Sequence, residues 1–134
     1  MHKTFTALLV ASFTALMAQP SAAHHSFAAE FDANAPIELT GTVTKVEWAN
    51  PHTYFYMDVM NPKGDIESWA LEMGSPNGLM RRGWTRDSMK LGDVVTVTGS
   101  RAKDGSFKGN ARSVVLSTGK KLFAGSSQDN AEAN

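Results

Sequence analysis

The sequence predicts an all-β protein with one short helix, and three observations support this fold class. Segments rich in β-branched and aromatic residues recur along the chain and alternate with turn residues, as strands do. Ser75-Pro76 and Gly83 bracket a short helix between the third and fourth of these segments. The order of three strands, one helix and two strands is that of a small five-stranded OB-like barrel. Another small β-roll or a sandwich is the alternative.

The individual elements follow from local composition. The first strand is expected over residues 37–48, with Gly41 where a strand would bend or bulge. The helix is expected over residues 76–82, and a further turn near residues 85–89. Turn residues gather at 61–65 and 103–106. The remaining strands are expected at residues 53–59, 66–73, 94–99 and about 111–116, before a short apolar stretch at 122–123.

Alternation divides the second strand into two faces. Phe55 and Met57 share the face that is expected to join the core. Tyr54 and Tyr56 share the opposite face, so at least one side of this strand is not simply core.

The methionines fall into two groups. Met57, Met73 and Met80 are expected in the core, where thioether side chains fill irregular gaps. Met60 and Met89 lie at the ends of expected elements and stay candidate soft metal ligands.

The first residues are typical of a cleavable signal peptide over residues 1–23. Lys3 gives a positive start, residues 7–18 are uncharged and mostly apolar, and residues 21–23 are small, as a signal peptidase requires. The alternative is a membrane anchor, but the apolar run is shorter than the ~20 residues that span a bilayer. Export to the periplasm or the medium is therefore expected, with His24 as the first residue of the mature chain.

Three further regions are expected after this leader. Residues 24–36 form an N-terminal arm, in which the four-residue spacing of Phe27 and Phe31 fits one helical turn. Residues 37–125 form the OB-like domain, and residues 126–134 form a tail that is disordered by composition.

Composition excludes several kinds of function. The chain has no cysteine, so thiol catalysis, thiol redox chemistry and thiolate metal sites are excluded. Lys and Arg number 13, as do Asp and Glu, and this balance argues against a nucleic-acid partner. Motifs for a serine nucleophile, a zinc protease or a phosphate loop are absent from the sequence, so we do not expect an enzyme.

Several longer phrases are more specific than composition. They are HHSFAAEFD (24–32), LTGTVTKVEWANPH (39–52), GSPNGLMRRGWTRDSMKLGD (74–93), RAKDGS (101–106) and NARSV (110–114). Together they resemble a family of small exported bacterial proteins of unknown function, over nearly the whole mature chain. The resemblance implies a signal peptide that ends just before His24-His25, and it implies no activity.

A looser likeness, of layout only, is to periplasmic copper and silver chaperones built on small OB barrels. That likeness implies a soft monovalent ion held by one His, two Met and one Trp. Trp48, His52, Met57 and Met60 lie in one region here, but their spacing does not reproduce the chaperone motif.

Histidines provide the first functional hypothesis, which is copper binding. As a mature N-terminus, His24 would offer its amine and its Nδ1 as a bidentate chelate, and a second imidazole would complete a three-nitrogen set that suits copper. His25 and His52 are the candidates for that second imidazole. The alternatives are that His24 and His25 are the polar end of a flexible arm, and that His52 only hydrogen-bonds its turn.

Aromatic and arginine side chains provide the second hypothesis, an interaction module for a protein or a small organic ligand. Three arginines surround Trp84 and would hold an anion or carboxylate with cation–π support. The alternative is a solvated helix face paired with Glu72 or Asp87. The candidate ligand-binding residues are Trp48, Tyr54, Tyr56, Arg81, Arg82, Trp84 and Arg86.

Overall fold

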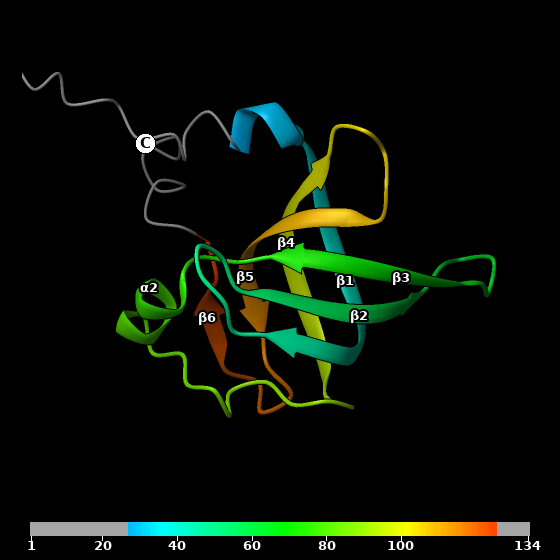
Figure 1. Cartoon of the computed structure of the whole chain (residues 1–134). Helices are drawn as coiled ribbons and strands as arrows, with labels where there is room; N and C mark the ends of the chain where they lie inside the picture. Colours follow the sequence, from blue (N-terminus) through cyan, green and yellow to red (C-terminus); the bar gives the residue numbers. More distant parts are fainter. Residues whose placement is uncertain (1–26, 126–134) are drawn as a thin grey trace, which may run out of the picture.

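A long first strand organises the fold, which the computed structural model describes for residues 27–125 (Figure 1). The strands are β1 (Phe31–Glu47), β2 (Tyr54–Met60), β3 (Ile66–Glu72), β4 (Val94–Ala102), β5 (Lys108–Val115) and β6 (Lys121–Phe123). The helix α2 (Pro76–Arg81) lies between β3 and β4 in the chain. Ser75 caps it by accepting a hydrogen bond from the backbone N–H of Gly78 at 3.2 Å.

The six-stranded sheet closes in a ring. β1 pairs antiparallel with β4 through its first part and with β2 through its last part, so that it belongs to both halves of the ring. The closure is a parallel pairing of β3 with β5, in which Ala70 lies beside Lys108 and Glu72 beside Asn110. The predicted fold class is confirmed, and β6 adds a short sixth strand along β5.

Gly41 lies where β1 passes close to the backbone of β2. A Cβ atom at this position would lie 2.3 Å from the carbonyl oxygen of Asp58, so only glycine fits without a shift of one strand. The register of the β1–β2 pair is irregular a little further along, between Val43 and Lys45. The bend expected near Gly41 is therefore a close approach followed by a bulge.

The core fills the ring with the inward side chains of the strands. Met57 and Met73 are buried as expected, but Met80 is 49% exposed, so its predicted core position is wrong. α2 buries Pro76 and Leu79, and Met80 follows Leu79 on the solvent side of this six-residue helix.

The two candidate soft ligands among the methionines differ in exposure. Met89 is buried in the core, which removes it from the set of accessible metal ligands. Met60 is exposed at the end of β2.

Strand β1 begins at Phe31 rather than at residue 37, so part of the expected arm belongs to the sheet. Phe31 and Asp32 pair with Ala102 and Arg101 at the extended end of β4, and the register then shifts before Pro36. The helical turn expected ahead of it is confirmed at residues 27–30, with the rings of Phe27 and Phe31 5.7 Å apart between centroids. The expected signal peptide, His24, His25 and the expected tail lie outside the described residues.

No helix within residues 27–125 combines the length and the apolar character needed to cross a bilayer.

Candidate functional site

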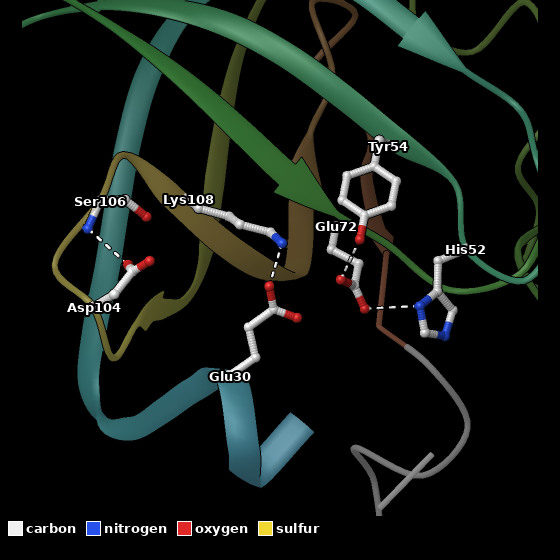
Figure 2. Close-up of polar contacts among 7 residues, drawn as sticks. All are labelled: Glu30, His52, Tyr54, Glu72, Asp104, Ser106 and Lys108. Atoms are coloured by element: carbon white, nitrogen blue, oxygen red, sulfur yellow. Dashed lines mark hydrogen bonds and ion pairs between the residues drawn. The ribbon is translucent and has the colours of Figure 1, made fainter. Parts of the chain in front are cut away.

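A histidine, a buried glutamate and a tyrosine form a connected group at one end of the ring. Nδ1 of His52 lies 2.8 Å from Oε1 of Glu72. The hydroxyl of Tyr54 donates a hydrogen bond of 2.5 Å to the other carboxylate oxygen, Oε2. The Glu72 side chain is only 9% exposed, whereas the His52 side chain is 26% exposed (Figure 2). We call these three residues the His–Glu–Tyr group.

The β2–β3 hairpin positions this group. Its register places Tyr54 directly opposite Glu72, with both side chains on the outer face of the ring. His52 precedes β2 in the loop from β1, and the neighbouring Thr53 is tied to the far end of β3. The backbone N–H of Thr53 donates to Gly74 at 3.0 Å, and that of Met73 donates to Thr53 at 2.8 Å. The loop therefore holds His52 against the end of β3.

The chemistry of the three partners fixes the imidazole proton. Burial, and then the hydrogen bond to Glu72, raises the pKa of Tyr54, so the phenol keeps its proton and donates it to the carboxylate. An ionised carboxylate can only accept hydrogen bonds, so Nδ1 of His52 carries a hydrogen when it faces Glu72. In the neutral imidazole the lone pair then lies on Nε2. This arrangement is typical of a histidine that is oriented by a carboxylate to bind a metal or to accept a proton.

A lysine and a second glutamate continue the group toward the N-terminus. The Nζ of Lys108 lies 5.9 Å from the centroid of the Tyr54 ring and 5.8 Å from that of Phe31. It also forms an ion pair with Glu30, which lies on the helical turn at residues 27–30. Figure 2 shows these side chains in a row that leads from Glu30 through Lys108 to Tyr54, Glu72 and His52.

Tyr56 forms a similar but more open arrangement on the same outer face. Its hydroxyl donates to Glu47 at 3.1 Å, and the Nζ of Lys45 lies 5.3 Å from its ring centroid. Lys45 also pairs with Glu47, and this contact, followed by the bond from Tyr56, lowers the pKa of that carboxyl. The outer face expected for Tyr54 and Tyr56 is confirmed by their partial exposure between the buried Phe55 and Met57.

The expected arginine cluster around Trp84 does not form. Trp84 is 2% exposed, and its Nε1–H donates to the carbonyl of Phe123 at 2.8 Å, so its ring is part of the core and cannot receive a ligand. The Cζ atom of Arg82 lies 4.2 Å from the ring centroid of Phe123 instead. Arg81 is exposed on the last turn of α2. The prediction failed because a tryptophan in a loop was assigned to the surface, whereas β6 covers it.

Arg86 and Trp48, two further candidate ligand-binding residues, lie close together. The Cζ atom of Arg86 lies 5.9 Å from the centroid of the Trp48 ring, which is half-buried against the core. Glu72 was one of two residues expected to pair with the arginines of the helix. It contacts His52 and Tyr54 instead, so that expectation is wrong.

Of the three predicted histidine ligands, the described part of the chain contains only His52. Within residues 27–125 no three His, Asp or Glu side chains lie close enough together to hold a metal ion.

Sequence reasoning missed three charged residues of this region. Glu72 contacts both His52 and Tyr54. Lys108 lies near the Tyr54 ring and pairs with Glu30. The signal for Glu72 was present in the hairpin. Once Met60 pairs with Ile66 across the turn, the antiparallel register carries Tyr54 opposite Glu72. Lys108 and Glu30 depend on the ring closure, for which no local pattern exists.

Comparison with known proteins identifies one relationship. The model of a family described only as a family of unknown function, DUF6152, matches residues 12–111. No curated protein has a significant similarity to the chain.

Proposed function

Because this chain belongs to DUF6152, a family of unknown function, we propose its function from the site itself: it is an exported protein that binds a copper ion between His52 and the N-terminal His24 of the processed chain. His25 is the alternative to His52 as the source of the second imidazole. The observation that carries this proposal is the contact between His52 and the buried Glu72.

This contact supports metal binding in two ways. It directs Nε2 of His52 away from Glu72, and it places a negative charge behind the imidazole, which makes the ring a better donor to a cation. Tyr54 fixes the carboxylate in turn, so the ligand is oriented before the metal arrives. A histidine with a free amine supplies two further nitrogens, and three nitrogens suit Cu(II).

Copper titration tests the proposal. Two proteins are compared, one that begins at His24 and one that carries a single extra residue before it, which removes the amine–imidazole chelate. We expect the extra residue to weaken Cu(II) binding by about 100-fold, and His52→Ala to weaken binding by the protein that begins at His24 by at least about 10-fold. Asn50→Ala in the same loop is the control and should bind as the parent does. Equal affinity of the two N-termini would contradict the proposal.

Glu72→Gln tests the role of the buried carboxylate. The amide keeps the shape but loses the charge behind the imidazole, so we expect copper affinity to fall by about 10-fold, as for other groups that orient a metal ligand. Nitrogen hyperfine structure in the electron paramagnetic resonance spectrum checks that His52 remains a ligand. An unchanged affinity would show that Glu72 only supports the loop.

A second candidate is an interaction module that uses the outer aromatic face. The observation that favours it is the pair of tyrosines whose hydroxyls are each held by a glutamate, which fixes both rings in partly exposed positions. A protein that begins at His24 and fails to bind copper would leave this candidate as the better one.

A further inference from the structure

A cavity of about 450 Å³ opens on the outer face of the ring, across β1, β4 and β5. It lies over the part of β4 from Thr98 to Ser100, with Glu38 of β1 on one side and Arg112 of β5 on the other. We call it the β4 pocket. None of its lining residues belongs to the His–Glu–Tyr group, so it is a separate site.

A bulge in β1 forms one side of the β4 pocket. Arg101 and Ser100 are consecutive on β4. Their partners on β1 are Asp32 and Pro36, which three further residues separate. This excess of chain has to bulge out of the ladder, and Ala33, which belongs to it, lines the pocket. The pocket therefore lies where the backbone departs from a regular sheet.

A second bulge turns Arg112 toward the outer face. Thr98 of β4 pairs with Ser113 of β5. The next residue, Gly99, pairs with Ala111, so Arg112 has no partner on β4. Arg112 and Ser113 are consecutive, yet neither is buried, whereas in a regular strand one of the two would point into the core. Bulges re-aim side chains in this way and are frequent beside active sites.

Gly99 keeps β4 and β5 close together at this second bulge. A Cβ atom on Gly99 would lie 1.9 Å from the carbonyl oxygen of Asn110 and 3.1 Å from the Cα of Ala111. Only glycine therefore allows this approach directly before Arg112. The hydroxyls of Thr98 and Ser113 are hydrogen-bonded at 2.7 Å just beyond it. The arginine is thus carried by a strand that is fixed on both sides of the bulge.

The two charged side chains of the β4 pocket have opposite signs. Neither Glu38 nor Arg112 belongs to an ion pair within residues 27–125. Because β4 lies between their strands, and neighbouring strands are about 4.8 Å apart, their backbones are separated by roughly 10 Å. A negative and a positive group therefore flank the hydroxyl groups of Thr98 and Ser100, with the apolar ring of Pro36 beside them.

From this arrangement we infer that the β4 pocket binds a free α-amino acid with an apolar side chain. The carboxylate of the ligand binds Arg112, its ammonium binds Glu38, and its side chain packs against Pro36. A simple anion would be repelled by Glu38 and a simple cation by Arg112, whereas an amino acid carries both charges on one small unit. The volume of the pocket is in the range of small-molecule sites.

Amide chemical shifts of the ¹⁵N-labelled protein test the inference with three ligands. L-Leucine carries both charges, N-acetyl-L-leucine lacks the ammonium, and L-leucinamide lacks the carboxylate. We expect leucine to cause saturable shifts at residues 98–100 and 111–113, and each blocked analogue to bind about 10-fold more weakly. Equal affinity for leucine and either analogue, or no saturable shift at these residues, would overturn the inference.

Two substitutions assign the charges. Arg112→Gln should weaken leucine binding by about 10-fold and leave the affinity for leucinamide unchanged, because leucinamide has no carboxylate to lose. Glu38→Gln should likewise weaken the binding of leucine but not that of N-acetyl-leucine. Lys63→Gln and Asp65→Asn remove the same charges in the turn between β2 and β3 and should bind leucine as the parent does. Equal weakening of leucine and leucinamide by Arg112→Gln would overturn the inference. Glu38 and Arg112 are exposed, so both variants should keep the fold.

Discussion

The chain's two tyrosines, Tyr54 and Tyr56, lie two residues apart on the outer face of β2. Each donates its hydroxyl to a glutamate, and each phenol is partly removed from water. Burial first, and then these hydrogen bonds, raise the pKa of both side chains above the ordinary value of about 10. The folded protein therefore holds its phenolic protons more tightly than the unfolded chain does.

This shift predicts a specific response to alkali. The stabilisation is complete below pH of about 10 and is lost as the pH rises from there toward the raised values, because the unfolded chain releases these protons first. We expect tyrosinate absorbance to appear above pH 10 in the folded protein and near pH 10 in denaturant. Tyr56→Phe leaves the signal of Tyr54 alone, and it should titrate later than Tyr56 does in Tyr54→Phe. A normal midpoint for Tyr54 would contradict its burial against Glu72.

The residues of the site show how far sequence reasoning reaches at this scale. The sequence predicts His52 as a candidate ligand because it is a histidine in a loop between two strands. It predicts Tyr54 on the outer face because side chains alternate along a strand. Glu72 has the same alternation as Tyr54, but its importance comes from burial at the end of the strand, which only the folded ring creates. A charged residue on the polar face of a strand is usually solvated, so composition alone favours the wrong reading.

At the scale of elements, Gly41 controls how closely β1 and β2 approach. A methyl group there would lie 2.3 Å from the Asp58 carbonyl and 2.9 Å from the Cε of Met57, so one strand would have to move. We expect Gly41→Ala to lower the free energy of unfolding by about 3 kcal/mol, as overpacking does. Chemical denaturation measures this, with the exposed neighbour Thr40→Ala as the control at under about 1 kcal/mol. Equal values for the two variants would contradict the close approach.

The elements differ in how well their sequences predicted them. α2 was located correctly because its signals are local: Ser75 caps its start, and Gly83, with a φ of +96°, follows its end. The residues on its buried face were harder to predict, and Met80 was wrongly expected in the core. Six residues make fewer than two helical turns, so their apolar side chains cannot show a clear helical period. The early start of β1 was missed because residues 32–36 have little strand propensity and are held by pairing with β4 at both ends.

At the scale of the whole molecule, β6 joins parts that are distant in the chain. The N–H of Ala124 donates to Arg112, and its carbonyl accepts from Gly74, each at 2.8 Å. The carbonyl of Phe123 accepts the indole N–H of Trp84, also at 2.8 Å. This three-residue strand and Ala124, which follows it, thereby connect β5, the segment after β3 and the loop after α2. No sequence pattern predicts such a role, because the partners of this short strand lie far from it in the chain.

Removing β6 tests this role. A mature chain that ends at Gly119 loses the buried Leu122 and Ala124 and leaves the indole N–H of Trp84 without its acceptor. Burial of a leucine contributes about 2 kcal/mol, and a buried donor without a partner costs about 2 kcal/mol. At 4–8 °C for each kcal/mol, we expect the unfolding temperature to fall by at least about 15 °C. Tryptophan fluorescence should shift to the red at low temperature as Trp84 meets water. The control is a chain that ends at Gly125 and therefore keeps β6 and Ala124. Its unfolding temperature should equal that of the full mature chain. Equal unfolding temperatures of the two truncated chains would show that the ring is stable without its sixth strand.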